Sequence, residues 1–133
     1  MYRGSCLCGA IQYEATAVGP IAVCHCKRCR KANGTAFNAI VPVNASDFRL
    51  LSGDAELTKF ESSPGVGRYF CKTCGSPIYS RRDAMPELLR LRIGTLDSPL
   101  PGKPTVHIFV GSKAEWHDIH DDAAKFGGRS SDG

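Results

Sequence analysis

The chain has 133 residues, of which 42% are hydrophobic and 23% are charged, and its formal net charge at pH 7 is +4. This length and composition are typical of one globular domain with one hydrophobic core. Its seventeen basic and thirteen acidic residues fall short of the dense basic surface of a nucleic-acid-binding protein, so we expect no nucleic-acid partner.

The N-terminal segment Met1–Ser5 runs directly into a cysteine motif, which leaves no room for the charged and apolar regions of a secretion signal. The most apolar stretch, Ala36–Val43, is interrupted by Asn38 and Pro42 and is much shorter than the ~18 apolar residues of a membrane span. We therefore expect a cytoplasmic protein with no membrane partner. In a reducing compartment, clustered cysteines are more often metal ligands or catalytic thiols than disulfides.

Short strand patterns run through most of the chain. Gly9–Ala15 alternates apolar and polar residues, with the β-forming residues Ile11 and Tyr13 on one side. Turn-forming Ser, Gly, Asp and Pro residues separate the later patterns. Further predicted strands are Ala36–Val43, Phe48–Leu51, Leu57–Glu61, Arg68–Phe70, Ile78–Ser80, Leu88–Thr95 and Val106–Val110. The sequence therefore predicts a mostly β domain of antiparallel sheets.

Helical structure is expected to be minor. Lys27–Ala32 and the segment from Ala114 onward could each form a turn or two of helix, but neither has a sustained 3.6-residue apolar pattern. We assign residues 1–126 to a single domain and expect the polar, Gly/Ser-rich residues 127–133 to be a disordered tail. The preceding Asp121 and Asp122 are interpreted as a solvated acidic end of the domain.

Seven cysteines form three clusters. The C-x-x-C turn of Cys71 and Cys74, followed by Gly75, resembles half of a zinc knuckle. Cys6 and Cys8 could complete a four-cysteine site with it, or two cysteines of the middle cluster could. The first pairing leaves three thiolates together, whereas the second leaves three cysteines without a common partner. Counting therefore favours a division into four and three, with the three at Cys24, Cys26 and Cys29.

Other interpretations of the cysteines remain open at this stage. Disulfides would require an oxidising compartment and an even count, and a C-x-C disulfide loop would be strained. Free buried cysteines would not be expected to cluster in this way. Iron–sulfur ligation by four cysteines is a competitor to zinc, because spacing alone separates the two poorly.

The middle cluster predicts an open metal site. A zinc ion with only three protein ligands keeps one position for water or substrate, as in catalytic sites. A histidine could close that position: His25 lies between two of the cysteines, while His107 and His117 would have to fold back from far along the chain. Three thiolates make an electron-rich centre that would suit a substrate thiolate as the fourth ligand.

Four cations surround the last of these cysteines: Lys27, Arg28, Arg30 and Lys31. They could form a solvated basic turn, which is the common role of such runs. Alternatively, they could offset the thiolate charge and attract an anionic substrate, with Arg28 and Lys31 as candidate substrate contacts.

Taken together and in this order, the motifs resemble the glutathione-dependent formaldehyde-activating enzyme (GFA) family, a zinc-binding family with an Mss4-like β-fold. The resemblance spans nearly the whole chain. It rests on Gly4–Glu14 (GSCLCGAIQYE), Cys24–Lys31 (CHCKRCRK), Gly34–Phe37 (GTAF), Tyr69–Ile78 (YFCKTCGSPI), His107–Val110 (HIFV) and Lys113–Trp116 (KAEW).

The resemblance implies two zinc ions per chain: a structural one held by the residues matching Cys6, Cys8, Cys71 and Cys74, and one at the active site held by those matching Cys24, Cys26 and Cys29. It implies a carbon–sulfur lyase-type enzyme acting on a thiol or thiol adduct, such as glutathione or S-hydroxymethylglutathione. Candidates for the general base are His25 and His107. The alternative function is a non-catalytic zinc module that binds another protein, since one scaffold can serve either purpose.

Overall fold

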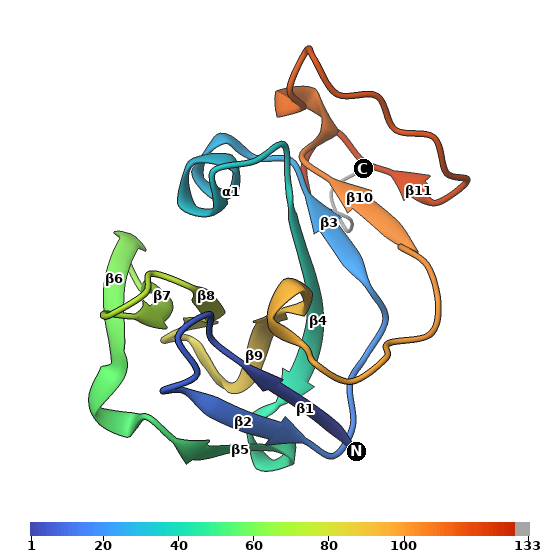
Figure 1. The fold of residues 1–133 in the computed structure, drawn as a ribbon. Coiled ribbons are helices and arrows are strands. Elements are labelled where there is room, and N and C mark those ends of the chain that lie inside the picture. Colours follow the sequence, from blue (N-terminus) through green and yellow to red (C-terminus); the bar gives the residue numbers. More distant parts are fainter. Residues whose placement is uncertain (130–133) are drawn as a thin grey trace. The chain divides into compact units, whose positions relative to one another are not determined.

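A computed structural model describes residues 1–129, and the chain divides into two compact units (Figure 1). Unit 1 comprises residues 1–19 and 41–101, and unit 2 comprises residues 20–40 and the chain from Gly102 onward. Strands are the main regular structure of the described chain, which confirms the predicted mostly β fold. Within the described residues, no helix is long and apolar enough to cross a membrane.

Unit 1 contains a three-stranded antiparallel sheet in the order β1-β2-β5. Its strands are β1 (Tyr2–Ser5), β2 (Gln12–Ala15) and β5 (Phe48–Ser52). The alternation predicted from the sequence is present here: the side chains of Ile11, Tyr13 and Ala15 are fully buried, whereas that of Gln12, between Ile11 and Tyr13, is exposed.

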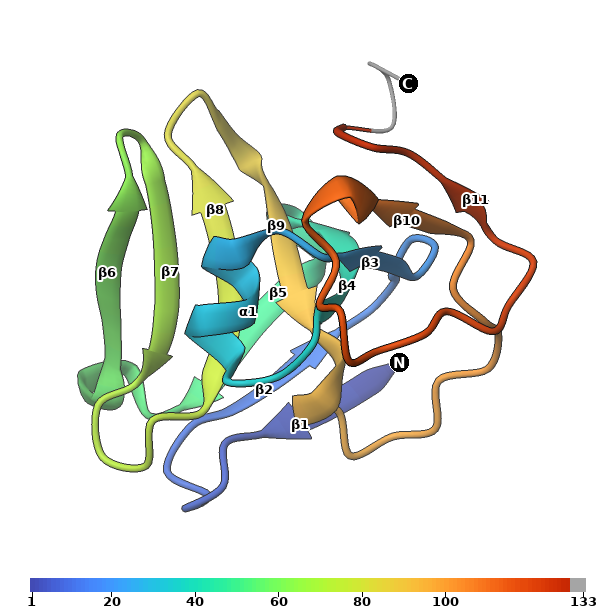
Figure 2. The same ribbon diagram turned by 90° about the horizontal axis from the view of Figure 1, so that it is seen from above.

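A second part of unit 1 is an antiparallel succession of four strands. These strands lie side by side in Figure 2 and are β6 (Leu57–Ser63), β7 (Val66–Cys71), β8 (Pro77–Arg82) and β9 (Met85–Arg92). Short 3-10 turns connect or follow strands of this unit, namely η1 (Ala45–Asp47), η2 (Asp54–Glu56) and η3 (Ile93–Thr95). The apolar core of unit 1 includes Ile11, Tyr13, Val41, Val43, Ile78, Tyr79, Leu89 and Leu91.

Unit 2 is built on a small mixed sheet. Strand β10 (Val106–Ile108) pairs in parallel with both β3 (Ala22–Cys24) and β11 (Ala124–Lys125), and β3 pairs antiparallel with the first residues of β4 (Asn38–Asn44). The one α-helix of the described chain, α1 (Lys27–Asn33), follows β3 directly, and a 3-10 turn, η4 (Val110–Ser112), follows β10. Strand β4 begins in unit 2 and ends in unit 1.

Most predicted elements are present, with four differences. Each predicted strand overlaps an observed one, and Lys27–Ala32 is helical, but β1, β3, β11 and the parallel pairs of unit 2 were not predicted from the sequence. These three strands have only two to four residues, too few for a period to be recognised. Residues 93–95 form a 3-10 turn instead of strand, and the helix expected from Ala114 onward was wrong, because that segment folds into turns and a short strand.

The predicted tail at 127–133 falls partly outside the described residues, which end at Arg129. Within the described part, the carbonyl of Gly128 accepts a hydrogen bond from the amide of Phe109 at 2.9 Å. Residues 130–133 lie outside the described residues.

Candidate metal centres

In unit 1 the four outer cysteines meet at one point. The sulfur atoms of Cys6, Cys8, Cys71 and Cys74 all lie within 4.8 Å of one another. The sulfurs of Cys6 and Cys8 are 3.5 Å apart, and those of Cys8 and Cys71 are 3.8 Å apart. Tetrahedral zinc with Zn–S distances near 2.3 Å places its sulfur ligands ~3.8 Å apart. This four-cysteine site therefore has the donor set and spacing for one thiolate-bound metal ion.

Two backbone turns present these sulfurs. In the first turn, the amide of Gly9 donates to the carbonyl of Cys6 at 3.0 Å, and in the second, the amide of Gly75 donates to the carbonyl of Cys71 at 2.8 Å. Both glycines have a positive φ, +82° and +80°, which other residues adopt only with strain. The side chain of Ser76 joins the turns, because its hydroxyl accepts a hydrogen bond from the amide of Leu7 at 2.9 Å.

Backbone and hydroxyl donors favour the thiolate form in this site. The amide of Ile11 lies 3.3 Å from the sulfur of Cys6, and the hydroxyl of Ser76 lies 3.3 Å from the sulfur of Cys74. Hydrogen bonds from the side chain and backbone of Ser76 lower the pKa of Cys74 to about 5. Thiolates are the form that binds metals, so these donors prepare the site for an ion.

In unit 2 the three middle cysteines also meet. The sulfurs of Cys24, Cys26 and Cys29 lie within 4.8 Å of one another, and no histidine, aspartate or glutamate of residues 1–129 joins that group. A closing histidine ligand, which the sequence left open, is therefore not present in the described geometry. The close sulfurs of Cys26 and Cys29 share hydrogen bonds with Cys24 and raise the pKa of its thiol. A bound cation would reverse that effect.

Helix α1 and strand β4 arrange this three-cysteine site. Cys24 ends β3, and Cys26 is the N-cap of α1, where its sulfur accepts from the amide of Cys29 at 3.4 Å. The buried amide of Asn38 donates to the sulfur of Cys29 at 3.8 Å and is itself oriented by a bond from Asn33 at 2.9 Å. The site is thus built from one short stretch of chain with side-chain support from β4.

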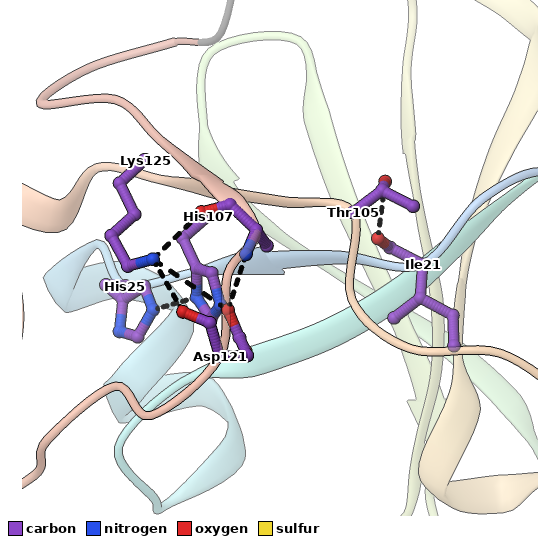
Figure 3. A network of polar contacts seen from close by, with 7 residues as sticks. Ile21, His25, Thr105, His107, Asp121 and Lys125 are labelled. Carbon is purple, nitrogen blue, oxygen red and sulfur yellow. Dashed lines mark hydrogen bonds and ion pairs between the residues drawn. The ribbon is translucent and has the colours of Figure 1, made fainter.

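The ring of His25 is not part of the three-sulfur group and belongs instead to a chain of hydrogen-bonded side chains (Figure 3). Its Nε2 lies 2.8 Å from Nδ1 of His107, and Nε2 of His107 lies 2.9 and 3.1 Å from the two carboxylate oxygens of Asp121. Burial, with the nearby ring of His107 next in importance, lowers the pKa of His25 to about 4, so the ring is neutral near pH 7. The hydrogen bond from His107 lowers the pKa of Asp121.

These hydrogen bonds change the interpretation of Asp121 and distinguish the two histidines that were candidates for the general base. Asp121 and Asp122 were interpreted as a solvated acidic end; Asp122 is exposed, but the carboxylate of Asp121, which is 32% exposed, is hydrogen-bonded to a buried histidine. Of the two candidate bases, His107 has both ring nitrogens hydrogen-bonded, whereas Nδ1 of His25 is buried without a partner in the described residues. No spacing pattern points to Asp121 or Asn38, because they reach the site only through the pairing of β10 with β11 and of β3 with β4.

The four predicted cations lie on α1. Lys27, Arg28 and Lys31 are exposed, and Arg30 is half-buried because its guanidinium donates to the carbonyl of Ser112 at 3.1 Å. Arg28 and Lys31 are three residues apart and therefore lie on one side of the helix. None of the seven cysteines forms a disulfide, which does not support the disulfide interpretation.

Comparison with known proteins identifies the family. A family model described as "Glutathione-dependent formaldehyde-activating enzyme" (GFA) matches residues 1–112. The chain belongs to this family. The matched range of the GFA model includes all seven cysteines, His25 and His107, but ends before Asp121.

Individual relatives agree with the assignment to the GFA family. An "Uncharacterized lyase" from Schizosaccharomyces pombe is 34% identical over 79 residues, which cover 59% of this chain and 56% of that protein. A "Putative glutathione-dependent formaldehyde-activating enzyme" from Aspergillus flavus is 23% identical over 116 residues, covering 85% of this chain and 54% of that protein. The chain thus spans about half the length of these relatives.

A solved structure is also similar to this chain. The crystal structure of a Rhodobacter sphaeroides protein matches with a TM-score of 0.63 and 25% sequence identity. The match covers 74% of this chain and 91% of that protein. Most of the fold of this chain is therefore shared with a solved structure.

Proposed function

We propose that this chain is a zinc-dependent enzyme of carbon–sulfur lyase type that acts on a thiol or thiol adduct, such as glutathione or S-hydroxymethylglutathione. The observation that carries the proposal is the three-cysteine site. Three sulfurs converge there, and within the described residues no fourth protein ligand of the usual kinds joins them. A thiolate from a substrate would complete a tetrahedral set.

The names of the relatives support this choice of substrate class, since they refer to glutathione, formaldehyde and lyase activity. In the proposed reaction the sulfur of the thiol attacks the carbon of formaldehyde, one carbon–sulfur bond forms, and the thiol proton ends on the former carbonyl oxygen. The lyase direction reverses these steps. A reducing compartment such as the cytoplasm would keep both the cysteines and the substrate as thiols.

Each part of unit 2 has a role in the proposal. Cys24, Cys26 and Cys29 would hold the second of two zinc ions, whose Lewis acidity favours the thiolate form of a thiol substrate. Arg28 and Lys31, exposed on α1, would attract the carboxylates of an anionic thiol such as glutathione. In unit 1, Cys6, Cys8, Cys71 and Cys74 would hold the first zinc ion and stabilise the fold.

Metal counting combined with a ligand titration tests the proposal. We expect about two zinc ions per chain, and after cobalt substitution we expect glutathione to change the absorption of one cobalt site only. S-Methylglutathione, which lacks the thiol, is the matched control and should change neither site. One tightly bound ion per chain, with no response to any small thiol, would reject the enzyme and favour the non-catalytic module.

A further inference from the structure

A chain of three hydrogen-bonded side chains in unit 2 ends beside the three-cysteine site. It runs from the carboxylate of Asp121 through the ring of His107 to the ring of His25, which lies between Cys24 and Cys26 (Figure 3). Both histidines are buried, with 4% of His107 and none of His25 exposed. Buried polar groups of this kind are retained where a fixed arrangement is needed.

The carboxylate of Asp121 is itself held in place where β11 meets β10. One of its oxygens accepts from the amide of Ala123 at 3.0 Å, and Nζ of Lys125 donates to the carbonyl of Asp121 at 3.0 Å. The amide of Phe126 donates to the carbonyl of His107 at 2.9 Å. Backbone and side-chain bonds therefore fix both ends of the Asp121–His107 contact.

The order of donors and acceptors along this chain follows from the carboxylate. An ionised carboxylate only accepts hydrogen bonds, so the hydrogen of His107 must be on Nε2. In a neutral imidazole the other nitrogen then accepts, and Nδ1 of His107 can take a hydrogen bond only from Nε2–H of His25. When both rings are neutral, Asp121 thereby selects a single tautomer for each ring, with Nε2 protonated in both.

The ring and the backbone of His25 are both fixed. Its amide donates to the carbonyl of Ile108 at 3.0 Å, and its ring packs beside Phe37 and His117, with centroid distances of 5.9 and 6.3 Å. His25 is the residue between two of the three sulfur-bearing residues. The backbone that carries its ring therefore also carries the sulfurs of Cys24 and Cys26.

We propose that Asp121 and His107 are positioning residues for the three-cysteine site: they lock His25 in one tautomer and orientation and so hold the Cys24–Cys26 turn in its metal-binding geometry. This inference rests on the proposed function, because it takes the three thiolates as metal ligands. Loss of an outer partner of a metal site typically lowers metal affinity 10–100-fold. His25 is adjacent to ligands without being one, so we expect the lower end, about tenfold.

Cobalt titration of the reduced, metal-free protein tests the inference. We expect wild type to take up two Co²⁺ ions in two steps, and Asp121→Ala to weaken the second step about tenfold while leaving the first unchanged. Asp121→Asn keeps a neutral oxygen acceptor for His107, so its affinity should lie between wild type and Asp121→Ala. Asp122→Ala, which removes the neighbouring exposed carboxylate, should behave as wild type.

The first cobalt step also reports folding, because its ligands are all in unit 1. If Asp121→Ala does not fold, the comparison of Asp121→Asn with Asp122→Asn decides instead. An Asp121 variant that binds the second ion as tightly as its Asp122 control would overturn the positioning role alone. Wild type that takes up only one ion would remove the proposed function, and the positioning role with it.

A spectroscopic measurement addresses the tautomers directly. Long-range ¹H–¹⁵N correlation spectra of the zinc-loaded protein should show Nε2–H tautomers for both His25 and His107, and Asp121→Ala should release that constraint on His107. A merely structural carboxylate would leave the two tautomers unchanged. A protonated Nδ1 on either ring in wild type would overturn the inference.

Discussion

The two cysteine sites differ most in the length of chain that they join. In unit 1, Cys8 and Cys71 are neighbours in space but 63 residues apart in sequence, whereas the cysteines of unit 2 all lie within residues 24–29. Bringing distant residues together costs conformational entropy, and this cost grows with the length of the loop. A metal ion in the four-cysteine site would therefore contribute to folding, whereas one in the three-cysteine site would join residues that are already close.

The sites also differ in what orients their sulfurs. In unit 1 the sulfurs are approached by the amide of Ile11 and the hydroxyl of Ser76 within two glycine-containing turns. In unit 2 the backbone amide of Cys29 approaches the sulfur of Cys26, and buried side chains add support, Asn38 beside Cys29 and His107 beside His25.

The largest expected effect follows from removing a ligand of the four-cysteine site. Cys71→Ser should lose the first metal ion and lower the free energy of unfolding by at least about 5 kcal/mol, a large part of the ~10 kcal/mol that a structural zinc contributes. Urea unfolding with metal analysis of the same samples measures both quantities. A variant that retains nearly full stability without the first ion would show that the long loop is closed by packing alone.

A steric change beside the same site should have the next largest effect. Gly53 has φ of +85°, and a Cβ there would lie 2.4 Å from the carbonyl oxygen of Ala10, which follows the Cys6–Cys8 turn. Gly53→Ala should therefore destabilise the protein by about 2–4 kcal/mol through backbone strain and overpacking. Gly94→Ala is the control, since nothing lies within 4 Å of its Cβ position. If the two variants have equal free energies of unfolding, the backbone around Gly53 adjusts to the added Cβ without loss of stability, and the prediction is wrong.

The buried Tyr13 makes unit 1 sensitive to alkaline pH. Its hydroxyl lies 2.6 Å from that of Thr95, and burial raises its pKa from 10.0 to about 12. Between these values the unfolded state has lost the proton that the folded state keeps, so stability falls as the pH rises. With one pKa unit corresponding to somewhat more than ~1 kcal/mol, the loss is on the order of 2 kcal/mol by pH 12. Urea unfolding from pH 9 to 12 should show a shallower fall for Tyr13→Phe than for wild type, and identical slopes would contradict the assignment.

The sequence predicted the parts of both sites that depend on residues close together in the chain. The C-x-C and C-x-x-C spacings identified each half of the four-cysteine site, and counting the seven cysteines led to their division into four and three. The mostly β fold followed from alternation, as at Ile11 and Tyr13. These features depend on local periodicity, which a single sequence displays.

What the sequence could not show depends on strand pairing. Asp121 reaches His107 only because β11, a strand of two residues, pairs in parallel with β10. A strand so short has no periodicity, and an Asp-Asp pair in a polar region is usually solvated. The sequence places His25 between Cys24 and Cys26, but its contact with His107 depends on the pairing of β3 with β10 and could not be predicted from spacing.

The smallest expected effect on stability is also the most direct test of the comparison. Cys29→Ser should abolish binding of the second metal ion yet change the free energy of unfolding by no more than about 1 kcal/mol, because the ion joins only neighbouring residues. Cys71→Ser is its matched partner, since both substitutions put a hydroxyl at a buried position, with 0% of Cys71 and 7% of Cys29 exposed. The cost of burying that hydroxyl is therefore shared, and the difference in stability between the two variants isolates what each ion contributes to folding. If both variants unfold at the same urea concentration, a metal ion in the four-cysteine site contributes no more to folding than one in the three-cysteine site, and the comparison is wrong.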